Sequence, residues 1–188
     1  MIPDWFWQAV ETPSEEHVVE VDGCDVLWRA WGDADRPGLL LVHGMSAHSR
    51  WWDFVAPLLT DAWRPVALDL TGMGDSDYRH DYTMGTFANE LVAVADAAGL
   101  GADVPVVAHS FGGRVAIRAL RDHPERFGPL VLADSAVRTV EQEEARQARG
   151  GPGRIGGAGV LYPTREDAQA RFRLQPPQPV ETTGTPAA

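Results

Sequence analysis

Residues 104–113 hold a serine in a setting suited to nucleophilic catalysis. The segment AHSFG, residues 108–112, follows a short apolar run and leads into a helical pattern. A serine on so sharp a strand-to-helix turn needs small residues two positions away on each side, because strand and helix must approach closely. Ala108 and Gly112 are small enough. The pattern predicts a nucleophile elbow with Ser110 at its tip, although serine here also suits a helix N-cap.

Two further segments follow apolar runs. His43-Gly44-Met45 comes after the run at 38–42. DLTGMGDS, residues 69–76, begins with the last two residues of the apolar run at 65–70 and continues beyond it. Ligands of open parallel sheets bind outside the carboxyl ends of the strands, so we expect these loops beside Ser110. In the second loop the glycines shape a turn rather than cradle a phosphate, and Asp69 is expected to tie the loop down.

The elements that must position these residues follow from periodicity. Expected strands are 17–21, 25–31, 38–42, 65–70, 104–108 and 129–133, and expected helices are 51–59, 86–98 and 113–122. Asp22-Gly23 is a hairpin signal between the first two strands. Two strands followed by repeated strand–helix units predict an α/β fold, a mostly parallel sheet with helices on both faces.

With these three motifs in this order and at this spacing, the chain resembles the α/β-hydrolase fold family from about residue 17 to about residue 175. The resemblance is to the branch with a His-Gly loop and a D-x-x-G-x-G-x-S loop, which includes esterases, lipases and C–C bond hydrolases. It implies a three-layer sandwich and a serine hydrolase that acts on an ester or related acyl bond, or on a C–C bond, of a small-molecule substrate. It implies no cofactor and no metal.

Carried over by motif, the resemblance makes Ser110 the nucleophile and the backbone N–H groups of Met45 and Phe111 the oxyanion hole. It also implies three residues that shape the pocket: His43, Gly44 and Gly112. Serine rather than aspartate at position 110 favours ester-like chemistry over the dehalogenase or epoxide hydrolase chemistry of this fold.

A general base is harder to find. The fold gives Ser, then Asp or Glu, then His in chain order, but the last histidine is His123, roughly 18 Å along one helix from Ser110. Three other histidines follow strands on the correct side of the sheet, and each is more simply a loop residue: His43, His48 and His80. Asp134, at the end of the sixth strand, is a candidate acid because some members of the fold place theirs there.

We expect three regions: an α/β-hydrolase core at 1–137, a partial cap or lid at 138–175 and a disordered tail at 176–188. Thr164 reads as the N-cap of a helix in the cap. A G-x-G-x-x-G match at 151–156 follows no strand, so it reads as a linker rather than a dinucleotide site. Family members continue with two more strands that carry the acid and the histidine. The chain is therefore interpreted as a truncated member that lacks the C-terminal strands and the catalytic histidine.

The composition of the chain limits the kinds of partner that we expect it to bind. The net charge is −11 and the basic residues are all arginine; the charge argues against nucleic acid and anionic membrane, and the lack of lysine excludes a Walker loop or a Schiff base. A single cysteine and a start without a signal peptide favour a cytoplasmic location. Residues 5–7 (WFW) are expected to pack on the sheet rather than touch lipid.

Loss of the last strands would leave the sixth strand at an open apolar edge, which predicts an oligomer or an aggregate. Two alternatives to an active hydrolase stay open: a non-catalytic module that binds a ligand or a partner, and a gene remnant.

Overall fold

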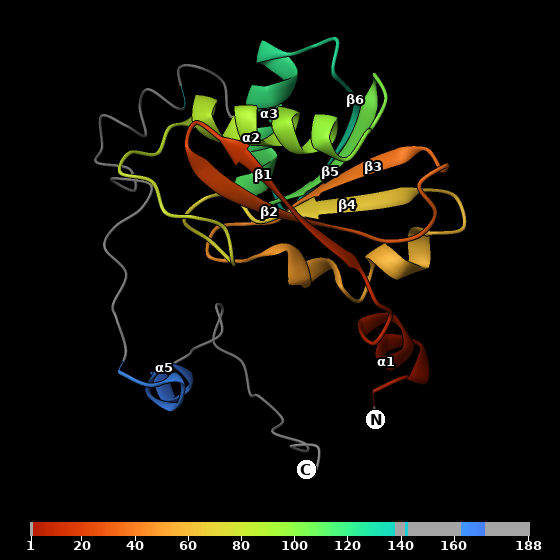
Figure 1. Ribbon diagram of the computed structural model, residues 1–188, viewed down its shortest axis with the longest axis vertical. Helices are drawn as coiled ribbons and strands as arrows, with labels where there is room; N and C mark the ends of the chain where they lie inside the picture. The colour runs from red at the N-terminus through yellow and green to blue at the C-terminus, as the bar shows by residue number, and fades with distance from the viewer. Residues whose placement is uncertain (1, 138–141, 143–162, 172–188) are drawn as a thin grey trace. The chain divides into compact units, whose positions relative to one another are not determined.

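A six-stranded sheet forms the centre of the first of two units, Met1–Gly156, in the computed structural model (Figure 1). The structure describes residues 2–137, 142 and 163–171. The strands are β1 (Glu15–Val21), β2 (Cys24–Ala30), β3 (Gly38–Val42), β4 (Arg64–Leu68), β5 (Val104–His109) and β6 (Phe127–Ala133). Each strand predicted from the sequence is present, with ends that differ by a few residues.

The strand order is β1-β2-β4-β3-β5-β6. β1 and β2 form the predicted hairpin, in which Asp22 and Gly23 both take the positive φ that a tight turn of this kind requires. β2 is antiparallel to β4, and the remaining pairs are parallel. The carboxyl ends of β3, β4, β5 and β6 therefore lie along one edge of the sheet.

Two helices, α2 (Met84–Ala97) and α3 (Phe111–Asp122), lie together on one face of this sheet (Figure 1). β3 is buried on both sides, as its unbroken apolar run predicts. Leu40 and Val42 join the core beneath the two helices, while Leu39 and Leu41 join a smaller core on the other face. The result is the three-layer α/β sandwich expected from the element order.

The helix predicted at 51–59 is wrong. The segment forms two short 3-10 helices, η1 (Ser49–Trp52) and η2 (Ala56–Leu59). Pro57 explains the break, because proline lacks the N–H that a continuous helix needs and its ring would clash with the carbonyl of Asp53. The apolar residues of the segment are split: Trp52 and Ala56 are buried in the smaller core, whereas Trp51 and Leu58 of the predicted apolar face are 49% and 55% exposed.

A short helix, α1 (Asp4–Val10), precedes the sheet and was not predicted. Phe6 packs on Phe54 with ring centroids 5.8 Å apart. Trp5 and Trp7 instead remain 49% and 47% exposed, so the expectation that this aromatic run packs on the sheet is wrong for both indoles.

In the second unit, Gly157–Ala188, the described residues are 163–171. They include α5 (Arg165–Arg171), and the Asp167 N–H donates to the Thr164 hydroxyl at 3.1 Å. The predicted N-cap is therefore confirmed. Most of the predicted cap, the linker at 151–156 and the predicted tail at 176–188 lie outside the described residues, so those boundaries stay predictions.

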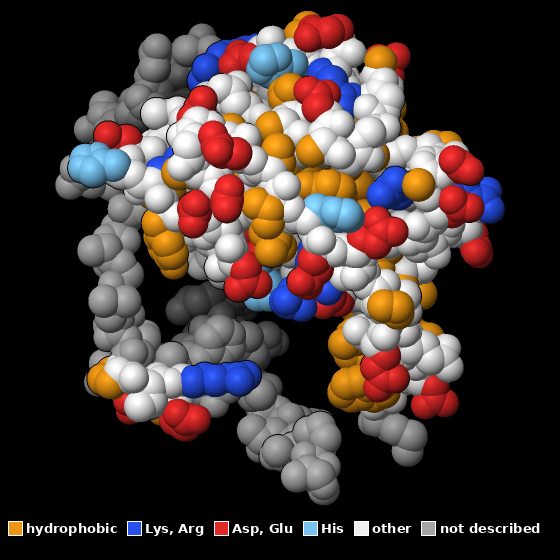
Figure 2. Space-filling view, viewed as in Figure 1, with side chains coloured by type: hydrophobic (Ala, Val, Ile, Leu, Met, Phe, Trp, Pro, Cys, Tyr) orange, Lys and Arg blue, Asp and Glu red, His pale blue; other side chains and the backbone are white. Residues whose placement is uncertain are grey.

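Acidic side chains are spread widely over the face shown in Figure 2, in keeping with the net charge of −11. Within residues 2–137, 142 and 163–171, no helix has the length and apolar character that crossing a bilayer requires.

Candidate active site

Ser110 sits at the junction of β5 and α3 in a strained backbone conformation, with φ 51° and ψ −112°. A non-glycine residue at positive φ is uncommon, and such strain clusters at functional turns. The turn is held in place by the N–H of Ser110, which donates to the carbonyl of Ala133 on β6 at 2.9 Å. The Ser110 side chain makes no capping hydrogen bond to α3. A helix N-cap role therefore does not account for this serine.

The elbow is closely packed on its helical side. A Cβ atom added at Gly112 would lie 2.8 Å from the carbonyl oxygen of Val42 and would overlap that of His43. The predicted need for a small residue two positions after Ser110 is thus met against the backbone of β3. Phe111, the next residue after the serine, is buried and meets Phe87 edge to face at 5.5 Å.

The loop after β3 lies directly against the elbow. A Cβ atom added at Gly44 would lie 3.3 Å from Cβ of Ser110 and 2.8 Å from Nδ1 of His109. Met45, the next residue, has a half-exposed side chain. The structure therefore brings together two segments that the sequence separates by more than sixty residues, the predicted oxyanion loop and the predicted nucleophile.

His43 is fully buried beneath this loop, and both ring nitrogens are occupied. Nδ1 donates to the Gly44 carbonyl at 2.7 Å, and Nε2 accepts the N–H of Leu70 at 3.1 Å. Burial lowers the pKa of His43, because the charged imidazolium loses its hydration. A neutral ring with this hydrogen bonding ties the loop after β3 to the loop after β4, and it has no nitrogen left to serve Ser110 as a base.

His43 should make the fold less stable in acid. Because its folded pKa is depressed, its contribution to stability is present above the unfolded value of 6.5 and is lost as pH falls through the folded pKa. We expect the wild-type free energy of unfolding to fall relative to that of His43→Gln below about pH 6.5, by up to about 1.4 kcal/mol per pH unit. Urea titrations of both proteins between pH 5 and 8 measure this difference. A difference that stays constant over that range would contradict the neutral, buried imidazole.

No hydrogen bond joins Ser110 to any of the other histidines in the described residues. His80 is 98% exposed and pairs with Asp81 at 3.1 Å. His123 ends α3 at the opposite end from Ser110, as predicted. His48 is exposed at the start of η1, and His109 stacks on Trp51 with ring centroids 5.4 Å apart. This contact between Trp51 and His109 was not predicted from the sequence.

Asp69 holds the loop after β4, as predicted. Its carboxylate accepts the N–H of Ser49 at 2.5 Å and the N–H of Asp75 at 2.8 Å. Gly74 adopts φ +59°, and a Cβ atom there would overlap the Asp69 carboxylate. The glycine and the aspartate therefore fix the turn together, and the Asp69 carboxylate is engaged in these hydrogen bonds.

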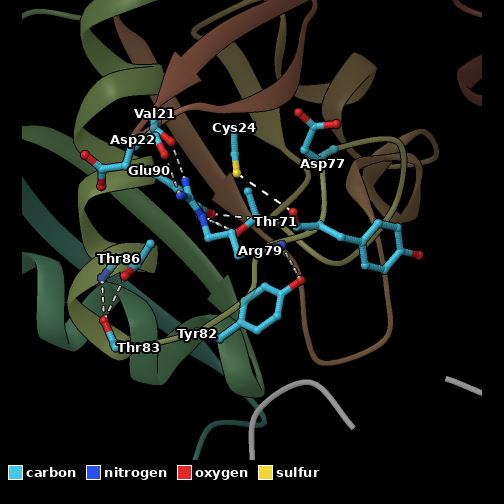
Figure 3. A network of polar contacts seen from close by, with 12 residues as sticks. Val21, Asp22, Cys24, Thr71, Asp77, Arg79, Tyr82, Thr83, Thr86 and Glu90 are labelled. Carbon is cyan, nitrogen blue, oxygen red and sulfur yellow. Dashed lines mark hydrogen bonds and ion pairs between the residues drawn. The ribbon is translucent and has the colours of Figure 1, made fainter. Parts of the chain in front are cut away.

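A buried polar network anchors the same loop to α2 (Figure 3). Glu90 on α2 accepts the N–H of Thr71 at 3.1 Å and the Thr71 hydroxyl at 2.5 Å, and it pairs with Arg79 at 3.1 Å. Arg79 also donates to the carbonyl of Val21 at the end of β1, at 2.6 Å. Burial raises the pKa of Glu90, although Thr71 and Arg79 oppose the shift.

The network was missed in the sequence, although a signal was there. Glu90 lies on the same face of the helical pattern as Phe87, Leu91 and Val94, and it is fully buried with them. A carboxylate within an apolar stripe calls for a buried partner, because an unpaired buried charge is costly. Its partner, Arg79, comes from an irregular loop that periodicity does not describe.

Asp134, the candidate acid, follows β6 immediately after the carbonyl that binds the Ser110 N–H. It is exposed and has φ 50°. Ser135, the next residue, packs against Gly113 in the first turn of α3. The structure therefore places Asp134 at the same sheet edge as Ser110, next to the elbow.

Comparison with known proteins agrees with this geometry. Residues 37–155 match a family model described as alpha/beta hydrolase fold. The chain is 35% identical over 114 residues to Lipase LipV of Mycobacterium tuberculosis, which covers 60% of this chain and 42% of the lipase. The chain thus spans less than half the length of this curated relative.

Solved structures give the same result. A membrane phospholipase A described as a bacterial virulence factor superposes with a TM-score of 0.61 at 34% identity, over 73% of this chain and 46% of that protein. A thioesterase domain from the curacin biosynthetic pathway superposes with a TM-score of 0.62 at 25% identity, over 73% and 52%.

Proposed function

Because the chain belongs to the α/β-hydrolase fold family, we propose that it is the nucleophile-bearing part of a serine hydrolase that acts on an ester or related acyl bond. The strained Ser110 at the tip of the elbow is the observation that carries this proposal. The relatives named a lipase, a phospholipase A and a thioesterase support acyl chemistry, since each name refers to hydrolysis of an acyl ester or thioester.

In this reaction the Ser110 oxygen attacks the acyl carbonyl and forms a tetrahedral intermediate. The backbone N–H groups of Phe111 and Met45 receive the oxyanion, a task that typically lowers the barrier by about 3 kcal/mol per donor. The contact of Gly44 with Ser110 supports this assignment, because it brings the Met45 backbone to the elbow. His43, Gly44 and Gly112 shape the pocket by fixing the two loops.

The attack releases the Ser110 proton, and a base must take it. Within the described residues His43 is fully hydrogen-bonded and His80 is almost completely exposed. We infer that the base belongs to the portion of the relatives that this chain does not match. We propose Asp134, which follows the Ala133 carbonyl bound by the Ser110 N–H, as the acid that orients this imidazole.

A fluorophosphonate tests the proposal, because it reacts with an activated serine and leaves a mass increment on it. We expect one adduct on the intact protein and none on Ser110→Ala. Labelling should be slow and should accelerate steadily with pH, because the oxyanion donors remain while no described imidazole takes the proton. Ser135→Ala, a neighbouring hydroxyl at the elbow, is the matched control and should label as wild type does.

A second candidate is a non-catalytic module that uses the same loops to bind a small ligand or a partner. The occupied nitrogens of His43 favour it, and no hydrogen bond joins Ser110 to a histidine in the described part of the chain. Folded, soluble protein that gains no adduct over the whole pH range would support this module and contradict the hydrolase.

A further inference from the structure

The imidazole of His109 lies against the loop after β3, next to the proposed nucleophile. His109 is the last residue of β5 and immediately precedes Ser110. A Cβ atom added at Gly44 would lie 2.8 Å from Nδ1 and 3.3 Å from Cε1 of this ring. The edge of the imidazole therefore sets how closely Gly44, and with it the backbone of Met45, can approach the elbow.

The ring of His109 is held by packing rather than by a hydrogen bond at Nδ1. Within the described part of the chain, this nitrogen is buried and has no hydrogen-bond partner. The indole of Trp51 covers one face of the ring, with ring centroids 5.4 Å apart and an angle of 16° between the two planes. Side chains occupy discrete rotamers, and packing selects among them. We therefore expect the indole to fix the orientation of the imidazole.

Trp51 is itself carried by an anchored segment. It lies in η1, where the N–H of Ser49 donates to the carboxylate of Asp69 in the loop after β4. The residue that follows it, Trp52, is buried in the smaller core. The chain is thus fixed on both sides of Trp51, and η1 presents the indole to His109 as a rigid support.

We propose that Trp51 is a positioning residue of the site. By fixing the His109 ring, it holds the loop after β3 at the distance from Ser110 that the oxyanion donor requires. The inference rests on the proposed function, in which the Met45 N–H is one of those donors. Such catalysis depends on donors that are in place before the charge develops, and a misplacement of about 1 Å can cost about a hundredfold in rate.

A positioning role differs measurably from simple packing of the elbow. If Trp51 only adds packing, its removal lowers the free energy of unfolding but leaves the reactivity of Ser110 in the folded protein unchanged. If Trp51 positions the loop, its removal slows the reaction at Ser110 even under conditions in which the protein stays fully folded. The rate at which the native protein reacts with a fluorophosphonate therefore separates the two roles.

Trp51→Ala tests the inference against Trp7→Ala, a matched control on α1. The two indoles are 49% and 47% exposed, so both truncations should leave the protein folded. We expect Trp51→Ala to slow labelling of Ser110 about tenfold or more, whereas Trp7→Ala should stay within about twofold of the wild type. Trp51→Phe keeps an aromatic face on His109 and should recover most of the rate. Equal rates for the wild type and Trp51→Ala would overturn the inference.

A double-variant cycle shows whether Trp51 acts through His109. If it does, His109→Ala alone should slow labelling, and adding Trp51→Ala to that variant should change the rate by less than about twofold. Two effects that simply multiply would mean that Trp51 influences the site by another route, which contradicts the proposal.

Hydrogen exchange of the loop after β3 gives a measurement that does not need a reactive serine. The Ala47 amide donates to the Gly44 carbonyl at 3.3 Å and reports on this loop. It should exchange about tenfold faster in Trp51→Ala than in the wild type or in Trp7→Ala, while the amides of β3 stay unchanged. A wild type that does not label contradicts the hydrolase, and this exchange then decides the positioning role alone. Unchanged exchange at Ala47 would overturn that role whatever the labelling shows.

Discussion

Replacing Gly112 by alanine is expected to lower the free energy of unfolding by about 3 kcal/mol or more and to abolish labelling of Ser110. The added Cβ would lie 2.8 Å from the carbonyl oxygen of Val42 and would overlap that of His43. Both obstacles are backbone atoms of β3 and its loop, so no side-chain rotation relieves them. The first turn of α3 must move away from the sheet, and the elbow moves with it.

Gly101→Ala is the matched control for Gly112→Ala. A Cβ atom at Gly101 would meet nothing within 4 Å, and its φ lies outside the left-handed region. Urea denaturation of the three proteins, with fluorophosphonate labelling of each, measures both effects. If Gly112→Ala were as stable as Gly101→Ala and labelled normally, the close approach of helix and strand would have no role in the elbow.

Arg79→Met is expected to cost about 3–5 kcal/mol of stability, the usual effect of removing one partner from a buried ion pair. The Glu90 side chain is fully buried, and that of Arg79 is 7% exposed. The variant leaves the carboxylate with Thr71 as its remaining partner and removes the hydrogen bond from Arg79 to the Val21 carbonyl. The double variant Arg79→Met/Glu90→Met removes both charges and should recover most of the loss.

The loss should depend on pH in a defined direction. The folded pKa of Glu90 is already raised by burial, and removing the Arg79 charge raises it further. A carboxyl group whose folded pKa is raised contributes stability that is fully present below its unfolded pKa of 4.5. That contribution is lost as pH rises through the folded pKa. Both folded proteins keep the Glu90 proton just above pH 4.5, so the gap between wild type and Arg79→Met should widen only once pH rises above the folded pKa of Glu90 in the wild type, by up to about 1.4 kcal/mol per unit.

Urea titrations at several pH values between 5 and 8 measure that widening. The double variant is the control, because without Glu90 its gap to the single variant Glu90→Met should not follow this pH trend. A gap between wild type and Arg79→Met that is constant with pH would mean that Glu90 does not keep its proton when Arg79 is absent.

The sheet and the elbow could be predicted because local signals and tertiary packing agree there. The run at 38–42 is apolar throughout because both faces of β3 are covered. The small residues around Ser110 match a close approach to β3 that the structure confirms at Gly112. Where the signals conflicted, at 51–59, the apolar spacing predicted a helix whose apolar face would be buried, but Pro57 broke the helix and Trp51 and Leu58 of that face are about half exposed.

The polar contacts around the site could not be predicted in the same way. His43 bonds to its neighbour and to Leu70, and its second partner depends on how two loops meet. Arg79 reaches Glu90 and the carbonyl of Val21, which the sequence places far from each other. Periodicity reports which face of an element is buried, but it carries no information about partners contributed by irregular loops.

The anchoring of the loop after β4 has a consequence for ligand binding. Asp69 fixes the loop near its start, and Arg79 joins its far end to α2 and to the β1–β2 hairpin. The conformational entropy of this loop is therefore lost when the protein folds, not when a ligand arrives. A ligand that contacts it meets a preorganised wall and gains affinity for that reason. Any segment that opens and closes over Ser110 must then be a different part of the molecule.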